Sequence, residues 1–282
     1  MEAIKALLDR LSESGTTYEP LPPREYEQFK ADGLNATEGS RHLEDGYHCS
    51  VCKNKGYVVK VIEDDDGDFH QVMYDCKCVP IRNSILRMRR SGLKDIIKDY
   101  TFDKFEVTEP WQQTLKTAAM DYAANPEGWF FVGGQSGAGK THICTAISRE
   151  FLLAGRSVKY MLWRDEVVRL KANVNDAEAY QKMIDEYKRV DVLYIDDLFK
   201  TGKDKDGTAQ KPTVADINVA FEIINFRYND PNSVTIISSE LTEDELIDID
   251  EAVGGRIYER AKAITIGRDR SRNYRIKGAM TI

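Results

Sequence analysis

The sequence predicts an α/β protein built on a P-loop domain, in which a parallel sheet is flanked by helices and a small cysteine-rich module precedes the domain. Three observations support this prediction. A short apolar strand runs into the glycine-rich GQSGAGKTH at 134–142, strands and helices alternate from there to residue 267, and four of five cysteines form two tight pairs. The expected segments are a helical 1–45, a metal module 46–80, a basic linker helix 81–110 and the P-loop domain 111–282.

The first segment is expected to begin as an amphipathic helix. Its apolar residues recur at helical spacing and form one stripe, made of Ile4, Leu7, Leu8 and Leu11. Such a stripe is either a small core contact or a partner-binding face. We favour the partner-binding face, because so short a segment has little core of its own.

The two cysteine pairs predict a structural zinc site. Cys49 and Cys52 stand in a C-x2-C turn, and Cys76 and Cys78 follow a stretch at 57–75 that is typical of a β-hairpin. In a reducing cytosol, paired cysteines bind metal more often than they form disulfides. Four thiolates close a tetrahedral Zn²⁺ site, so the module is expected to be zinc-ribbon-like and to lack catalysis of its own. Imidazole binds zinc as well, so His70 or His48 is an alternative ligand.

The glycine-rich stretch is expected to bind a nucleotide, because it lies between the strand at 129–133 and a helix. Its glycines let backbone N–H groups face the phosphates at a helix N-terminus. Lys140 is expected to reach the β- and γ-phosphates, and the Thr141 hydroxyl to hold Mg²⁺. The cofactor-binding residues are therefore predicted to be Gly134, Gln135, Ser136, Gly137, Ala138, Gly139, Lys140, Thr141 and His142.

A second buried strand at 190–197 ends in two acidic residues. Asp196 is expected to bind the magnesium shell, and Asp197 to orient or activate the attacking water. An acidic pair at a strand end is also a common helix cap, but its combination with the P-loop favours the catalytic interpretation.

The rest of the domain is expected to alternate strands and helices. After the strand at 233–239, Ser239 and Glu240 are the candidates to sense the γ-phosphate. A polar loop is predicted at 199–212, and its GKDKDG run (202–207) is too polar to pack and is expected to be mobile. The other strands are predicted at 157–163 and 263–267, and the helices at 164–174, 177–190, 214–229, 242–250 and 254–261.

The C-terminal end is rich in arginine, although the whole chain has a net charge of −7. Arg256 or Arg260 is expected to reach the nucleotide of a neighbouring subunit as an arginine finger, which implies ATP-dependent self-assembly. The last strand is followed by further arginines that end in Arg275, and two of these C-terminal arginines are expected to contact nucleotide. A solvated basic surface is the other interpretation of these residues.

Composition narrows the class of protein. The negative net charge argues against a protein that coats nucleic acid non-specifically. No apolar run approaches the roughly 20 residues of a membrane helix, and the N-terminus lacks the pattern of a signal peptide, so we expect a cytoplasmic protein without membrane contact. A mixed group of aromatic and basic residues is a weaker candidate for stacking single-stranded DNA and consists of Tyr160, Trp163, Arg164, Arg169 and Lys171.

Taken together, these motifs resemble the AAA+ ATPases of the DnaC/DnaI helicase-loader group, particularly its phage and Gram-positive members. The resemblance covers residues 46–282 and rests on the cysteine module, RRSGL (89–93), YTFDKF (100–105), GGQSGAGKTH (133–142), LYIDDLFK (193–200), FEIINFRY (221–228), IISSE (236–240) and DRSRNYR (269–275). It implies a protein that binds ATP, contacts a DnaB-type replicative helicase hexamer through its N-terminal region and helps to place it on single-stranded DNA.

The resemblance also implies roles for individual residues. Lys140 and Thr141 match the Walker A pair, Asp196 the magnesium aspartate and Arg256 the finger. Arg275 matches the sensor-2 arginine, which contacts nucleotide within the chain, with Arg272 as the alternative. Two positions depart from the pattern of the group. Asp197 stands where many members have Glu, which predicts slow hydrolysis, and Glu240 stands where a sensor asparagine is usual.

Three other functions fit parts of the sequence. A nucleotide-bound adaptor with little ATP hydrolysis would explain Asp197 and Glu240. An IstB-type transposition ATPase shares the Walker motifs but usually lacks the cysteine module. A small-molecule P-loop kinase would need an acceptor pocket and a phosphate lid, and the sequence has no recognisable lid.

Overall fold

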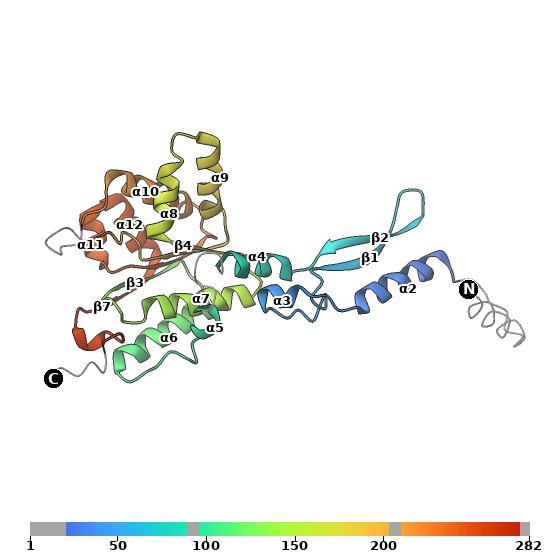
Figure 1. Ribbon diagram of the computed structural model, residues 1–282, viewed down its shortest axis with the longest axis horizontal. Coiled ribbons are helices and arrows are strands. Elements are labelled where there is room, and N and C mark those ends of the chain that lie inside the picture. Colours follow the sequence, from blue (N-terminus) through green and yellow to red (C-terminus); the bar gives the residue numbers. More distant parts are fainter. Residues whose placement is uncertain (1–20, 89–95, 203–209, 277–282) are drawn as a thin grey trace, which may run out of the picture. The chain divides into compact units, whose positions relative to one another are not determined.

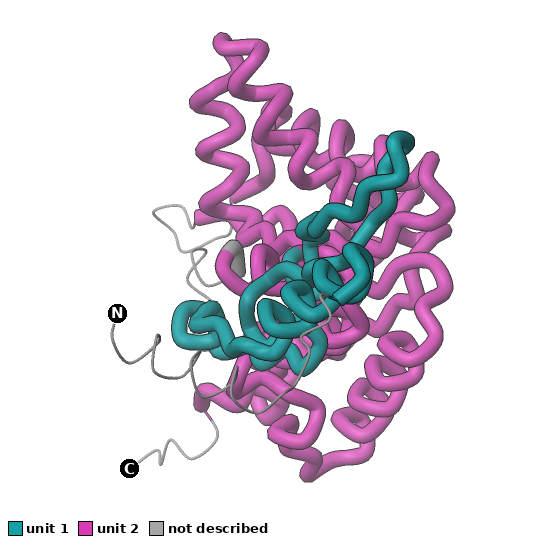
Figure 2. Tube along the Cα trace, turned by 90° about the vertical axis from the view of Figure 1, so that its right-hand side faces the viewer, with its two compact units in different colours: residues 1–79 teal, residues 80–282 magenta. Residues whose placement is uncertain are grey.

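The structure, a computed structural model, describes residues 21–88, 96–202 and 210–276. The chain divides into two compact units, Met1–Val79 and Pro80–Ile282 (Figure 2). The apolar stripe expected at residues 4–11 and the RRSGL motif at 89–93 lie outside the described residues, as do residues 203–209 of the polar loop at 199–212. The finer division at residues 45, 80 and 110 stays a prediction.

The first unit holds a helix on a β-hairpin. Its elements are α2 (Pro23–Ala36), α3 (Arg41–Asp45), β1 (Tyr57–Glu63) and β2 (Phe69–Asp75). The hairpin is antiparallel over its whole length, from the pair Tyr57 and Asp75 to the pair Glu63 and Phe69. Helix α2 docks on β1 through Asn35, whose amide donates to the Val59 carbonyl oxygen (2.8 Å) and accepts from the Val59 N–H (2.9 Å).

The second unit contains the predicted α/β domain. Helix α4 (Cys78–Met88) crosses the boundary into it, and a short 3₁₀ turn at Arg270–Arg272 follows its last strand. Its strands are β3 (Trp129–Gly134), β4 (Val158–Leu162), β5 (Val192–Asp196), β6 (Val234–Ser238) and β7 (Ala261–Ile266). Its further helices are α5 (Ile96–Asp99), α6 (Pro110–Ala124), α7 (Lys140–Leu153), α8 (Trp163–Ala172), α9 (Ala177–Lys188), α10 (Val214–Tyr228), α11 (Glu243–Ile249) and α12 (Glu251–Arg260).

The five strands form a parallel sheet in the order β4-β5-β6-β3-β7. Helices α6 and α7 lie on one side of this sheet, and α8 to α12 lie on the other (Figure 1). The α/β fold predicted from the sequence is therefore confirmed. Because β6 lies between β3 and β5, the residues that follow these three strands meet at one edge of the sheet.

One hydrophobic cluster of the core lies between the sheet and the helices α8 to α12. It includes fully buried aromatic side chains such as Trp129 and Phe131 on β3, packed with aliphatic side chains of β5 and α10. Within the described ranges no helix is both long and apolar enough to cross a bilayer.

Candidate functional site

The glycine-rich loop leaves β3 in a conformation that requires glycine. Gly134, Gly137 and Gly139 all have φ between 73° and 97°, the left-handed region that side chains disfavour. A Cβ atom at Gly134 would lie 2.1 Å from the carbonyl oxygen of Ile266, and one at Gly137 would lie 2.0 Å from Oδ1 of Asn273. The loop is therefore tightly enclosed by the end of β7 and by the segment that follows this strand. Helix α7 starts directly after the loop at Lys140.

Lys140 is folded back into this loop. Its Nζ donates to the carbonyl oxygens of Gly134 (2.9 Å) and Gln135 (2.7 Å), and the side chain is almost completely buried. Burial lowers the pKa of Lys140, because a charged ammonium loses hydration in this position. A phosphate group would supply the negative charge that the two carbonyl groups only partly replace.

The Asp196 carboxylate accepts hydrogen bonds from three hydroxyl groups. Thr141 Oγ1 donates to Oδ1 at 3.2 Å, the phenol of Tyr160 donates to Oδ2 at 3.0 Å, and Ser238 Oγ donates to Oδ1. Burial raises the pKa of Asp196, and the hydrogen bonds from Ser238 and Tyr160 counteract that rise. The Thr141 hydroxyl and the Asp196 carboxylate are hard oxygen ligands side by side, which is the donor set that Mg²⁺ prefers.

Asp197 begins a strained turn after β5. It has φ of 58°, as does Phe199, and its carboxylate accepts a hydrogen bond from Lys200 Nζ at 2.8 Å. Lys200 also lies 3.1 Å from Oε1 of Glu240, which in turn accepts from Ser136 Oγ at 2.8 Å. The two acidic residues predicted for hydrolysis and phosphate sensing are thus joined through one lysine.

Ser239 and Glu240 take different positions after β6. Ser239 is fully buried, and its hydroxyl donates to the Leu198 carbonyl oxygen at 2.8 Å. Glu240 faces the glycine-rich loop. Only Glu240 of these two candidates lines the pocket described next.

A pocket of about 340 Å³ lies over the glycine-rich loop. It brings together predicted residues from four parts of the chain, namely Ser136, Gly137, Gly139, Lys140, Thr141, His142, Asp197, Glu240 and Arg275. Sequence reasoning missed several other lining residues, which are Tyr100, Lys104, Phe105, Glu106, Lys200 and Tyr274. Tyr100 and Phe105 stand in YTFDKF, Lys200 in LYIDDLFK and Tyr274 in DRSRNYR, so these motifs marked the site without revealing a role.

The aromatic wall of this pocket is built around His142. The imidazole stacks on Tyr100 with ring centroids 4.6 Å apart, and its edge meets Phe105 at 5.2 Å. Its Nε2 lies 2.8 Å from the Thr101 carbonyl oxygen, which assigns the ring proton to Nε2. Flat apolar surfaces of this kind suit a nucleobase.

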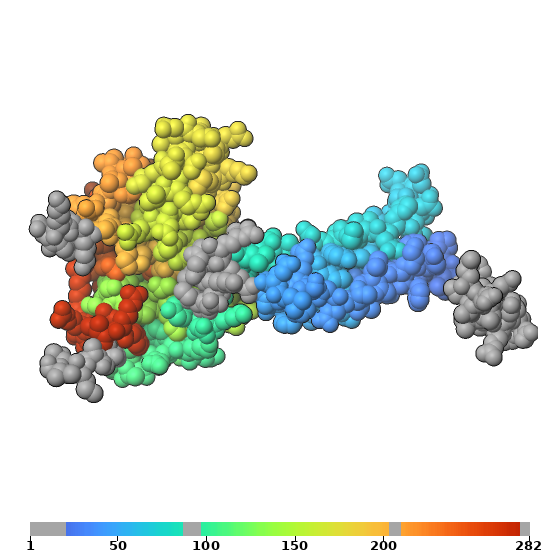
Figure 3. Space-filling model, in the orientation of Figure 1, coloured from blue at the N-terminus to red at the C-terminus, as the bar shows by residue number. Residues whose placement is uncertain are grey.

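The segment after β7 closes against the glycine-rich loop. The Tyr274 N–H donates to the Gly137 carbonyl oxygen at 2.9 Å, and the Asp269 N–H donates to Gln135 Oε1 at 3.0 Å. Figure 3 shows these C-terminal residues, in red, beside green residues of the same unit. Arg275, at the end of this segment, lines the pocket, whereas Arg272 lies over the Trp111 ring and donates to the Gly267 carbonyl oxygen.

The two finger candidates lie outside the lining of this pocket. Arg256 stacks on Phe221 and Tyr228 with its guanidinium 5.2 and 5.4 Å from the ring centroids. Arg260 lies 6.0 Å from the rings of Trp129 and Tyr228. A contact with nucleotide by either arginine would have to be made in a neighbouring subunit.

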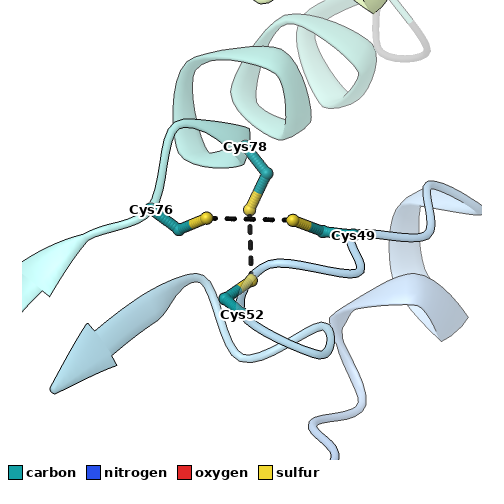
Figure 4. Close-up of side chains that lie close together, drawn as sticks. All are labelled: Cys49, Cys52, Cys76 and Cys78. Carbon is teal, nitrogen blue, oxygen red and sulfur yellow. Dashed lines mark hydrogen bonds between the residues drawn. The ribbon is translucent and has the colours of Figure 1, made fainter. Parts of the chain in front are cut away.

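The four cysteines of the first unit converge on one point (Figure 4). The Sγ atoms of Cys49 and Cys76 lie 3.8 Å apart, those of Cys52 and Cys78 lie 3.5 Å apart, and all four lie within 4.8 Å. A tetrahedral zinc with Zn–S bonds of about 2.3 Å requires Sγ separations of about 3.8 Å, so the cluster fits this metal. Burial works against ionisation, yet the Gly56 N–H and the neighbouring thiols lower the pKa of Cys52 to about 7.

Neither histidine alternative lies in this cluster. His70 Nε2 is 2.5 Å from Asp64 Oδ2 on the hairpin, and the ring of His48 lies 4.8 Å from that of His42. The structure therefore brings together the cysteine set predicted from the spacing, without His48 or His70.

The expected stacking platform for single-stranded DNA is wrong in its aromatic members. Tyr160 and Trp163 are 5% and 2% exposed, so no base can reach their rings. Tyr160 binds Asp196, and Trp163 meets Phe199 edge to face at 5.4 Å. Their burial follows from their place on and directly after strand β4, which packs in the core.

A parallel sheet that joins a glycine-rich loop after one strand to an acidic pair after another defines a P-loop nucleotide-binding fold. The chain belongs more specifically to the IstB-like ATP binding protein family, whose model matches residues 76–273. The resemblance to the DnaC/DnaI group is confirmed by the relatives and the solved structures.

Among curated relatives, XkdC of the phage-like element PBSX of Bacillus subtilis is 30% identical over 247 residues, which are 82% of this chain and 87% of XkdC. YqaM of the same organism is 32% identical over 199 residues, covering 66% of this chain and 60% of YqaM. The replicative helicase loader DnaC of Escherichia coli is 27% identical over 113 residues, which span 39% of this chain and 46% of DnaC. The chain thus spans less than two thirds of YqaM and of DnaC.

Two crystal structures share the fold. The DnaC helicase loader aligns with a TM-score of 0.51 at 21% identity over 61% of this chain and 99% of that structure. DnaI gives the same TM-score and identity over 61% of this chain and 93% of that structure. These likenesses establish the fold of the ATP-binding unit.

Proposed function

We propose that this protein is an ATP-controlled loader that binds a DnaB-type replicative helicase and helps to place it on single-stranded DNA when replication starts in the cytosol. The observation that carries the proposal is the Thr141–Asp196 contact beside a glycine-rich loop, in a chain related to DnaC. The cysteine module forms a second unit. All four of its thiols are used within the cluster and none is left for catalysis, so we propose that this unit binds a partner.

In the proposed cycle, Lys140 exchanges the carbonyl groups of Gly134 and Gln135 for the phosphates of ATP. Thr141 and Asp196 would hold Mg²⁺, which would neutralise phosphate charge when bound. Once the Asp197 carboxylate has separated from Lys200, it orients the attacking water. The short reach of aspartate and its ion pair both favour slow hydrolysis.

The four cysteines are proposed to hold a structural Zn²⁺. Its role would be to fix the turn that contains Cys49 and Cys52, in which Lys53 and Asn54 have positive φ. The Cys49 N–H already donates to Asn54 Oδ1 at 2.8 Å, so the turn is shaped to present its thiols. A rigid module of this kind is suited to docking on the helicase.

Arg256 is proposed to complete the site of a neighbouring subunit, and Arg275 to contact nucleotide within its own chain. The position of Arg275 in the pocket lining supports the second role. The first role implies that ATP promotes self-assembly, because a finger acts only between subunits.

The experiment that tests the proposal is size-exclusion chromatography with light scattering on the protein mixed with the replicative helicase of its own source. Nucleotide-free, ATP and ADP samples are compared for the wild type, Lys140→Ala and the matched Lys159→Ala. Lys159 pairs with Glu186 in a different part of the unit. We expect a complex that forms or dissociates with nucleotide in the wild type and Lys159→Ala and does not respond in Lys140→Ala. A helicase that never binds would rule out the loader.

An IstB-like transposition ATPase is the second candidate, and the matched family model favours it. That function predicts ATP-dependent binding to duplex DNA without a helicase. A third candidate, a nucleotide-bound adaptor, is supported by the ion pair that engages Asp197. A measurement of ATP turnover separates the adaptor from a hydrolysing loader.

A further inference from the structure

Lys200 connects the two carboxylates that face the nucleotide pocket. Its Nζ lies 2.8 Å from Asp197 Oδ2 and 3.1 Å from Glu240 Oε1. Glu240 is bound in addition by Ser136 Oγ of the glycine-rich loop, at 2.8 Å. The turn after β5, the end of β6 and the glycine-rich loop therefore meet in one polar cluster.

The backbone around Lys200 is held in place by its neighbours. Phe199, with φ of 58°, is buried and packs edge-on against Trp163. The Lys200 N–H donates to the Asp197 carbonyl oxygen at 2.9 Å, and the Asp197 N–H donates to Ser238 Oγ at 3.1 Å. Non-glycine residues keep such strained angles only when the surroundings enforce them, which is common at functional sites.

Lys200 and Lys140 line the same pocket with Asp197 and Glu240. In the structure the two lysines and these two carboxylates balance in charge. Although burial works against the charge, Asp197 and Glu240 raise the pKa of Lys200, so it stays protonated. A γ-phosphate would add negative charge to this cluster and compete with both carboxylates for the Lys200 ammonium.

We propose that Lys200 is a second phosphate-binding lysine, which Asp197 and Glu240 hold in the absence of nucleotide and which the γ-phosphate of ATP takes over. Its transfer frees Asp197 to orient water, so the triphosphate itself releases the carboxylate needed for its hydrolysis. ADP lacks the γ-phosphate and leaves the cluster closed. This inference rests on the proposed ATP-dependent function and assigns the ATP-over-ADP preference of that site to Lys200.

The inference also accounts for Glu240. A carboxylate beside the phosphates would repel ATP if it were unpaired. Ser136 and Lys200 instead bind it at 2.8 and 3.1 Å. Although burial works against ionisation, these hydrogen bonds lower the pKa of Glu240. Glu240 therefore acts as a positioning residue, which keeps Lys200 at the pocket until phosphate arrives.

The test is equilibrium binding of fluorescent ATP and ADP analogues in the presence of Mg²⁺. For Lys200→Met we expect the affinity for ATP to fall at least tenfold and that for ADP to fall less than threefold. Lys159→Met is the matched control, because Lys159 forms a comparable ion pair with Glu186. It should leave both affinities unchanged. Equal losses of ATP and ADP affinity in Lys200→Met, or no loss, would overturn the proposal.

Loss of Lys200 also leaves the cluster with one unbalanced negative charge, so a charge-matched variant is needed. Lys200→Met/Glu240→Gln restores the net charge of the cluster. If Lys200 binds phosphate, the ratio of ATP affinity to ADP affinity in this double variant stays at least fivefold below that of the wild type. A return of this affinity ratio to the wild-type value would mean that only the charge balance mattered, and would overturn the proposal.

Glu240→Gln alone keeps an acceptor for Ser136 and weakens the hold on Lys200. It should raise ATP affinity about threefold in the protein that retains Lys200, and should have no such effect when it is combined with Lys200→Met. The single variant tests the proposal even if Lys200→Met does not fold. Helicase binding is measured separately on the same variants. If they form a normal helicase complex and their ratio of ATP affinity to ADP affinity is unchanged, the Lys200 inference is rejected and the loader function is retained.

Discussion

The phenol oxygen of Tyr160 lies 3.0 Å from Oδ2 of Asp196, so strand β4 supplies a hydrogen bond to the proposed magnesium carboxylate on the neighbouring strand β5. Both side chains are buried, and the bond is not exposed to competing water. Tyr160 therefore helps to set the direction of a carboxylate whose pKa burial raises.

The first prediction concerns this bond. Tyr160→Phe removes the donor and should weaken the Mg²⁺-dependent gain in ATP affinity by about tenfold, because a hydrogen bond to a charged group is worth ~1.5–3 kcal/mol. ATP affinity is measured with Mg²⁺ and with EDTA. Tyr187→Phe is the matched control, since Tyr187 is a buried tyrosine that donates to Glu166 at 2.7 Å. The same loss in both variants would show that the effect is not specific to Asp196.

The second prediction concerns Arg227, a fully buried arginine on α10. Its guanidinium donates to Thr235 Oγ1 and to five backbone carbonyl oxygens. Four of these precede strand β5 and one lies at the start of β6, and they belong to Tyr187, Lys188, Val190, Asp191 and Val234. Arg227→Met should lower the free energy of unfolding by more than about 3 kcal/mol, because several buried acceptors lose their donors together.

Urea unfolding followed by tryptophan fluorescence measures this change in the second unit, because Trp111, Trp129 and Trp163 all lie there. Arg189→Met is the control: Arg189 is exposed and pairs with Asp185, so its loss should cost less than about 0.5 kcal/mol. Similar urea midpoints of unfolding for Arg227→Met and Arg189→Met would contradict the stabilising role of the buried Arg227 network.

The third prediction concerns metal removal. The purified protein should contain one zinc per chain, and a strong chelator or Cys52→Ser should remove it and expose the first unit to limited proteolysis. Metal binding supplies most of the folding energy of so small a module. The second unit should keep its tryptophan unfolding midpoint. Cys144→Ala, which changes the buried cysteine outside the cluster, should retain the zinc. Metal-free protein with an intact first unit would exclude the structural zinc.

The fourth prediction concerns pH and His142. Burial lowers the pKa of His142 below its ordinary 6.5, so the folded protein favours the neutral ring and the unfolded chain binds more protons. The stabilisation is complete above pH 6.5 and is lost as the pH falls through the lower folded pKa. His142→Gln keeps a donor for the Thr101 carbonyl oxygen but does not titrate.

Unfolding is measured for both proteins between pH 7.5 and 5. The wild type should lose more stability than His142→Gln on acidification, by at most ~1.4 kcal/mol per pH unit, the limit for one proton. Parallel pH profiles would mean that His142 keeps its solution pKa in the folded protein.

Much of the ATP-binding unit could be predicted from the order of its residues. The glycine-rich loop between an apolar strand and a helix identifies the phosphate site, since only glycine readily adopts the positive φ that occurs at Gly134 and Gly137. The apolar run before Asp196 predicts a buried parallel strand. The spacing of the four cysteines likewise predicts the cluster that the structure contains. These features depend on neighbours in the chain, and local sequence encodes them directly.

Other features depended on which segments pack together. Tyr160 looked like a DNA-stacking residue, and Arg227 was one letter of a family motif. Only the order of the strands brings Tyr160 to Asp196, and only the packing of α10 on the sheet buries Arg227 among carbonyl groups. In the sequence Lys200 belongs to a polar loop, and only the structure shows that the turn after β5 places it between Asp197 and Glu240. Sequence alone thus determined the chemistry of the phosphate and cysteine sites. The tertiary structure decided which distant side chains serve them, because burial and hydrogen bonding arise from contacts between residues far apart in the chain.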